Sequence, residues 1–132
     1  MIDACLDTYG AFSKGSYATL TENLLFQSSY VNYLCYAIET ILCKNNIALK
    51  NIALIFPHNV NVLSWRQVMR QLCISNSQIY LNNIKKTGHC FGADPFINLQ
   101  CAINENLIVL GDYYLLVTVG LGATFSVILM QY

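Results

Sequence analysis

The chain is 132 residues long, 55% hydrophobic and only 11% charged, with seven basic side chains balancing seven acidic ones. This composition excludes a disordered tail, and the lack of clustered Lys and Arg argues against binding to nucleic acid or to an anionic membrane surface. The length fits one domain over residues 1–132. So few charges leave too little polar surface to cover a small domain, which predicts that another protein chain covers part of it.

The six cysteines are scattered along the chain and form no C-x-x-C pair, so they indicate neither a disulfide framework nor a zinc site. The first residues lack the pattern of a signal peptide, and we therefore expect free thiols and a cytoplasmic protein. The uncharged stretch 113–132 is long enough to cross a bilayer as a helix. However, Gly120-Leu121-Gly122 divides it into two β-branched runs, which favours two buried strands joined by a tight turn.

The first part of the chain predicts a strand followed by a long helix. Residues 1–18 are expected to form a strand and a loop. Thr19 and Glu22 have the spacing of a capping box, which predicts that a helix begins there. Apolar residues then recur on one helical face as far as Leu42, and the polar run 44–46 ends the helix.

A second strand and a second helix are expected next. The apolar run Ile52–Phe56 has the length of a strand, and Pro57 ends it abruptly. Asn61 is suited to cap the following helix, whose apolar positions recur at helical spacing as far as Leu72. The short run Ile79–Leu81 predicts a third strand.

The last part of the chain is expected to contain a third helix and two strands. The loop 85–89 leaves the third strand and places a histidine beside a glycine. A helix is expected within 92–106, with Asp94 as its N-cap and Pro95 at its first helical position. The two apolar runs of 113–132 then form the last two strands.

Strands that alternate with helices predict a βαβ arrangement: a mostly parallel sheet with helices on its faces and an antiparallel hairpin at the end. In such sheets, sites form where loops leave the carboxyl ends of strands. His58 follows the second strand, His89 the third, and Gly122 lies beyond the fourth. We therefore expect these three residues to gather at one site.

His58 and His89 are the only histidines in the chain. At the end of a strand an imidazole can donate a hydrogen bond, accept a proton or simply cap a helix. Together with Cys90 and Asp94 they include metal-ligand types, but their spacing matches no known metal motif, so we expect no metal.

No cysteine or serine lies at the kind of exposed elbow, flanked by small residues, that presents a nucleophile. Any covalent nucleophile is therefore expected to come from outside this sequence. The turn Gly120-Leu121-Gly122 can aim a backbone N–H at an oxyanion, or it can merely reverse the chain.

Four short motifs follow one another in the second half of the chain: Phe56–Asn61, Thr87–His89, Gly111-Asp112 and Val119–Thr124. As an ordered set they resemble the C-terminal half of the β-ketoacyl-acyl-carrier-protein synthase III family, of the thiolase superfamily. The resemblance implies an α/β fold: a thiolase-like half of layered helices and sheet with βαβαβαββ-type topology. A full member of that family contains a second half of the same topology.

In that family a cysteine of the N-terminal half carries an acyl group, while a histidine and an asparagine of the C-terminal half bind the thioester carbonyl of a malonyl group. The resemblance assigns the histidine to His58, a supporting amide to Asn61 and an oxyanion-hole N–H to the backbone of Gly122. His89 stands where the family usually has its asparagine, and a neutral imidazole N–H can donate as an amide does. The resemblance implies no bound cofactor, because the substrate arrives on the phosphopantetheine of an acyl carrier protein or on CoA.

The family's cysteine has no counterpart in this sequence, so we expect a split enzyme: this chain and a second chain equivalent to the N-terminal half, assembled as a heterotetramer. Such an enzyme would carry out decarboxylative condensation or acyl transfer from a thioester, in fatty-acid or in natural-product biosynthesis such as that of polyketides. Arg66 and Arg70 are the obvious groups for meeting an acidic carrier protein.

A different class of function remains open. The chain would then be a non-catalytic, degenerate thiolase-like half that stabilises an active partner, and His58 and His89 would take no part in chemistry.

Overall fold

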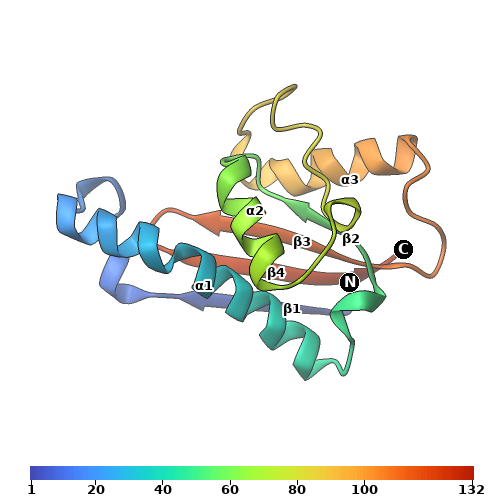
Figure 1. The fold of residues 1–132 in the computed structure, drawn as a ribbon, viewed down its shortest axis with the longest axis horizontal. Coiled ribbons are helices and arrows are strands. Elements are labelled where there is room, and N and C mark those ends of the chain that lie inside the picture. Colours follow the sequence, from blue (N-terminus) through green and yellow to red (C-terminus); the bar gives the residue numbers. More distant parts are fainter.

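A computed structural model describes the backbone of residues 1–132 and the surroundings of all of them except Gly15. Four strands form one sheet in the order β1-β4-β3-β2, and three α-helices pack on it (Figure 1). In chain order the elements are β1 (Asp3–Thr8), α1 (Leu20–Lys44), β2 (Ile52–Pro57), α2 (Val62–Gln71), α3 (Asp94–Asn104), β3 (Tyr113–Gly120) and β4 (Thr124–Gln131).

Three of the four strands run in the same direction, as expected of a mostly parallel sheet. Most pairings between neighbouring strands are nevertheless antiparallel. Strand β2 pairs in parallel with β3, whereas β4 pairs antiparallel with both β3 and β1. Strands β1, β2 and β3 therefore point one way and β4 points the other. Because β4 lies between β1 and β3, only one of the three pairings is parallel. The predicted antiparallel hairpin at the end of the chain is confirmed as β3 and β4, which face each other from Tyr113↔Gln131 to Gly120↔Thr124.

The predicted third strand over Ile79–Leu81 is wrong. Ile79 forms only an isolated parallel bridge with Ile55, held by the Tyr80 N–H, which donates to the Ile55 carbonyl at 3.0 Å. The chain then curls into turns in which Lys86 and Thr87 both donate their backbone N–H to the Asn83 carbonyl. Asparagine favours such turns, so the extended segment stops after one bridge.

Helices α1 and α2 cover one face of the sheet, and α3 covers the other (Figure 1). Alternate residues of β3 serve the two faces: Leu115 and Val117 pack with α1 and α2, whereas Tyr114 and Leu116 pack on the side of α3. Both faces of the strand are buried, which explains why its sequence is continuously apolar rather than alternating. The three-layer arrangement agrees with the predicted α/β class.

Local signals placed two of the three helix starts correctly. At the start of α1, Thr19 and Glu22 form the predicted capping box. At the start of α2, the Asn61 side chain accepts a hydrogen bond from the Leu63 N–H at 2.9 Å, as expected of an N-cap. The expectation for α3 is wrong, because its N-cap is Ala93 and Asp94 is already the first helical residue. The Asp94 carboxylate is engaged elsewhere, as described below.

The uncharged stretch 113–132 forms strands β3 and β4, as predicted. Across the part of the chain that the structure describes, none of the helices combines the length and the hydropathy needed to span a bilayer.

Candidate active site

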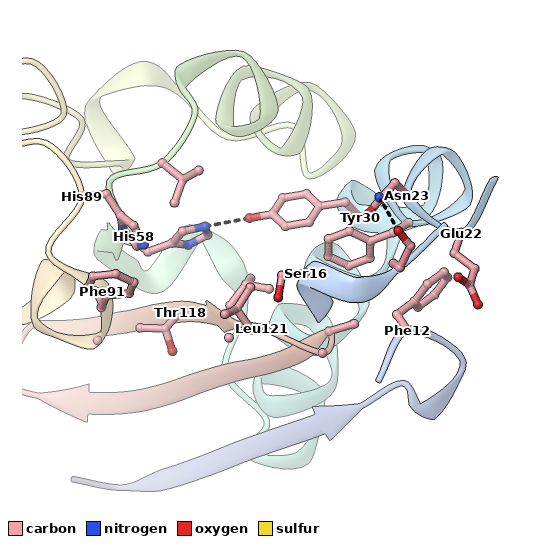
Figure 2. A pocket seen from close by; sticks show the side chains of 18 residues that line it. Phe12, Ser16, Glu22, Asn23, Tyr30, His58, His89, Phe91, Thr118 and Leu121 are labelled. Carbon is pink, nitrogen blue, oxygen red and sulfur yellow. Dashed lines mark hydrogen bonds between the residues drawn. The ribbon is translucent and has the colours of Figure 1, made fainter. Parts of the chain in front are cut away.

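A cavity of about 640 Å³ opens beside the ends of β2 and β3, next to the first half of α1 and the β3–β4 turn (Figure 2). Its wall is largely apolar and aromatic, and both histidines take part in it. Lining residues that matter for the chemistry are Phe26, Tyr30, His58, His89, Phe91 and Gly122. The structure thus brings together His58, His89 and Gly122. They lie in three separate loops: after β2, after the isolated bridge at Ile79, and between β3 and β4.

His58 lies directly after β2 and is 3% exposed. Its Nε2 atom is 2.8 Å from the Tyr30 hydroxyl, toward which it points in Figure 2. Its backbone carbonyl accepts a hydrogen bond from Trp65 Nε1 at 3.1 Å, and the Trp65 ring packs edge-on against the imidazole. The Nδ1 atom is buried and has no hydrogen-bond partner among the described residues. The loop and the Trp65 side chain therefore fix the ring with Nε2 facing the cavity side.

Burial lowers the pKa of His58 from its ordinary 6.5 to about 4. The neighbouring His89 lowers it further, whereas the Asp94 carboxylate and the Val117 backbone act in the opposite direction. Burial likewise raises the pKa of Tyr30, so its hydroxyl keeps its proton. At neutral pH, His58 is therefore an uncharged imidazole that faces a protonated phenol.

This lowered pKa predicts a loss of stability in mild acid. Between pH 6.5 and 4 the unfolded chain binds a proton at His58 that the folded chain does not. The free energy of unfolding is therefore highest above pH 6.5 and falls by about 3 kcal/mol as the pH drops to 4. Urea denaturation at pH 7 and at pH 5 measures this slope, and His58→Gln is expected to flatten it.

Two partly exposed carboxylates with lowered pKa values do not contribute to the stability change between pH 7 and pH 5. Hydrogen bonds to Lys44 and Lys14 lower the pKa values of Asp3 and Glu22 to about 2. Their contributions are lost only as the pH falls below their ordinary values of 3.8 and 4.5. A slope between pH 7 and 5 that is the same in His58→Gln would show that His58 is not its source.

His89 is held by a carboxylate. Its Nδ1 atom is 2.7 Å from Asp94 Oδ2, and its side chain is 36% exposed, compared with 0% for Asp94. The His89 ring packs against Phe91 and lies 6.3 Å, centre to centre, from the His58 ring. Its Nε2 atom has no hydrogen-bond partner among the described residues. His89 is thus the more accessible of the two histidines, with Nε2 free to meet a substrate.

Asp94 connects the loops that carry the two histidines. Besides His89 it accepts hydrogen bonds from the Cys90 N–H at 2.6 Å and from the Asn59 N–H at 2.7 Å. The sequence indicated a helix cap or a metal ligand at Asp94, and its link between the two histidine loops was not predicted. The only local signal was its position five residues after a histidine, while the contact with Asn59 depends on the fold.

A buried chain of amides reinforces the same loops. Asn98 is 0% exposed, and its Nδ2 donates to the Pro57 carbonyl at 2.8 Å and to Asn59 Oδ1 at 2.9 Å. Its Oδ1 accepts from Asn83 Nδ2 at 3.0 Å. Asn98 therefore links α3 to the end of β2 and to the turn before His89.

Replacing Asn98 with leucine is expected to reduce the free energy of unfolding by about 3 kcal/mol, because the Pro57, Asn59 and Asn83 groups lose buried partners. The matched control is Asn104→Leu, at the exposed end of the same helix, which is expected to stay within about 0.5 kcal/mol of the wild type. Equal unfolding curves for the two variants would contradict the role given to the amide network.

Of the other two predicted site residues, Gly122 lines the cavity and Asn61 does not. The exposed Asn61 caps α2 and makes no hydrogen bond to His58 among the described residues, so the supporting contact implied for it is not present in this structure. Gly122 lines the cavity with a φ of 79°, in the left-handed region that glycine adopts without strain.

The ring nitrogen of His89 that is hydrogen-bonded in this structure is Nδ1, which points at Asp94. Among the described residues, no group of three or more His, Cys, Asp and Glu side chains gathers in a way that could hold a metal ion, and none of the six cysteines lines the cavity.

Residues 42–132 match the family described as 3-oxoacyl-[acyl-carrier-protein (ACP)] synthase III C terminal. Among curated relatives, β-ketoacyl-[acyl-carrier-protein] synthase III of Clostridium novyi is 29% identical over 102 residues, which cover 77% of this chain and 31% of the relative. The same enzyme of Clostridium perfringens strain SM101 is 32% identical over 95 residues, which cover 72% and 29%. This chain spans about a third of the length of these relatives.

Solved structures agree with this match at the level of the fold. The 3-oxoacyl-[acyl-carrier-protein] synthase III of Aquifex aeolicus VF5 aligns with a TM-score of 0.84 at 23% identity, covering 98% of this chain and 43% of that one. An acyltransferase called ChlB3 aligns with a TM-score of 0.81 at 16% identity, covering 97% and 44%. The four-stranded sheet and its three helices therefore have the thiolase-like architecture of one half of such proteins.

Proposed function

Because this chain belongs to the family of C-terminal domains of 3-oxoacyl-[acyl-carrier-protein] synthase III, we propose that it forms half of an active site that transfers acyl groups from thioesters. The observation that carries the proposal is the pair of histidines in the wall of one apolar cavity, with ring centres 6.3 Å apart. An apolar cavity with a few convergent polar groups suits an acyl chain whose reactive end is a polar thioester.

His58 is the residue that binds the thioester oxygen. It is uncharged at neutral pH, and Nε2 is the ring nitrogen that faces the cavity side. In this role Nε2 carries the ring proton, which it donates to the thioester oxygen. A thioester carbonyl would take the place of the Tyr30 hydroxyl and accept this hydrogen bond. The backbone N–H of Gly122 is a second donor in the same wall.

The nucleophile of this site is a cysteine in the complementary N-terminal half of the fold, carried on a second chain. None of the cysteines of this chain lines the cavity, which supports a nucleophile from outside it. Several exposed apolar side chains of α1 and of the loops around the cavity are available for contact with the second chain. These residues are Leu20, Leu24, Leu25, Tyr36, Phe91 and Leu121. We propose that the two chains assemble as a heterotetramer in the cytoplasm, where thiols stay reduced.

The acyl donor is a thioester of an acyl carrier protein's phosphopantetheine or of CoA, and no further cofactor takes part. Arg66 and Arg70, both exposed on α2, are the basic groups nearest to a docked carrier in this proposal. The product belongs to fatty-acid or natural-product biosynthesis, formed by decarboxylative condensation or by acyl transfer.

The non-catalytic alternative has one observation in its favour. The Tyr30 hydroxyl already occupies the hydrogen-bonding position of His58 Nε2, as it would in a half whose histidine serves only to pack the loop. Replacement of His58 and His89 in the assembled enzyme separates the two functions, because a packing role leaves turnover unchanged.

The proposal is tested by native mass spectrometry of the protein isolated from its own host without denaturant. We expect a complex that contains the complementary half as a separate chain, and a mass gain of one acyl group on a cysteine of that half after incubation with acetyl-CoA or octanoyl-CoA. A complementary half on the same polypeptide as this chain would contradict only the two-chain arrangement, not the proposed chemistry. A complete assembly that gains no acyl group would contradict the proposed function.

A further inference from the structure

We propose that His89, with its ring fixed by Asp94, is a general base that removes the proton from an O–H or N–H group of the acyl acceptor. The acceptor class is then an alcohol, an amine or water, rather than the carbon of a decarboxylating malonyl group. This inference rests on the proposed function of the site and names its second substrate.

The hydrogen bonds of Asp94 indicate which atom carries the proton in the hydrogen bond between Asp94 and His89. The carboxylate is fully buried and meets three nitrogens: the backbone N–H groups of Cys90 and Asn59, and Nδ1 of His89. Backbone N–H groups can only donate, so both carboxylate oxygens already act as acceptors. Two backbone donors, one on each oxygen of a buried carboxylate, favour the form that accepts hydrogen bonds and donates none. The proton between Asp94 and His89 therefore lies on Nδ1.

This placement decides what His89 offers to a substrate. A neutral imidazole has one ring proton, and here that proton faces Asp94. Nε2 then carries a lone pair, is free of protein partners among the described residues and belongs to a side chain in the cavity wall. A lone pair repels the oxygen of a thioester or an enolate, which needs a donor, but it accepts the proton of a hydroxyl or amino group.

The two histidines are consequently suited to different tasks. His58 is buried and faces a phenol with Nε2, whereas His89 is partly exposed and paired with a carboxylate. A carboxylate on Nδ1 orients the ring and stabilises the imidazolium that forms when Nε2 takes a proton. His58 thus binds the carbonyl oxygen, and His89 moves the proton.

The resulting step balances without any further reactant. The acceptor oxygen or nitrogen attacks the acyl carbon of the cysteine thioester while its proton passes to Nε2 of His89. The tetrahedral intermediate collapses, its C–S bond breaks and the cysteine leaves as a thiolate. The His89 imidazolium then returns the proton to the thiolate, which leaves an ester, an amide or a free acid as the product.

The test compares His89→Asn and Asp94→Asn in the assembled enzyme, with Asp112→Asn as the matched control. Asp112 lies just before β3, its carboxylate accepts a hydrogen bond from the Val109 N–H, and it does not line the cavity. The acyl group is loaded from acetyl-CoA or octanoyl-CoA, and its loss to water or to added butan-1-ol is followed by intact mass. Release of CO₂ from malonyl-CoA is measured in parallel.

We expect His89→Asn to slow deacylation roughly 10²- to 10⁴-fold, the usual contribution of a general base, without slowing CO₂ release. Asp94→Asn is expected to slow deacylation as well, since an amide donor at that position turns the ring proton toward Nε2. Asp112→Asn is expected to match the wild type.

Normal loading with unchanged deacylation in His89→Asn, or a selective loss of CO₂ release, would overturn the inference while leaving the proposed function intact.

Discussion

Replacing His58 with alanine is expected to lower acyl transfer by the assembled enzyme about 10²- to 10³-fold, equivalent to about 2.7–4 kcal/mol of transition-state stabilisation. The reason is that Nε2 is held on the cavity side by the loop after β2 and by Trp65, so no other side chain of this loop can take its place. Single-turnover kinetics with an acyl-CoA donor measure the loss.

The fold should survive this replacement. Among the described residues, the Tyr30 hydroxyl is the side-chain group that loses its hydrogen bond to the His58 ring. Asn104→Ala, at the exposed end of α3, is the control for the effect of a truncation as such. A folded His58→Ala enzyme that keeps wild-type turnover would favour the non-catalytic alternative.

Replacing Phe125 with alanine is expected to reduce the free energy of unfolding by about 3–5 kcal/mol, because a fully buried ring leaves a cavity that its neighbours cannot fill. Phe125, on β4, packs against four aromatic rings of the β1–α1 region. These belong to Tyr9, Phe26, Tyr30 and Tyr33. Since Tyr30 carries the hydroxyl that meets His58, the same cluster supports one wall of the site.

The matched control is Phe96→Ala, which removes the same side chain from an exposed position of α3. It is expected to change stability by no more than about 0.5 kcal/mol. Denaturant unfolding of the intact protein measures both variants, and similar midpoints for the two would contradict the central place of Phe125 in the core.

Local sequence rules predicted the parts of the fold that depend on neighbours in the chain. Thr19 with Glu22, and Asn61, start helices through contacts within three residues, so their patterns were sufficient. The run Ile52–Phe56 was recognisable as a strand because both of its faces are buried. The run Ile79–Leu81 has a similar pattern but only one bridge partner, and pairing cannot be inferred from a single segment.

The same distinction applies to the site. The expectation that His58 and His89 converge followed from their places after extended segments, and the structure brings their rings together. The partners of the two rings were not predictable. Tyr30 lies 28 residues from His58 in sequence, and Asp94 reaches the Asn59 backbone across 35 residues. Such contacts depend on how α1 and α3 pack on the sheet, and they determine the surroundings of the two rings.

The most direct test of the account is a structure of the assembled enzyme with an octanoyl thioester trapped on its nucleophile. We expect the acyl chain in the cavity beside Phe26 and Phe91, and the thioester oxygen about 3 Å from His58 Nε2 in place of the Tyr30 hydroxyl. An acyl group bound elsewhere, with the bond between Tyr30 and His58 intact, would contradict an acyl-transfer site in this half of the fold.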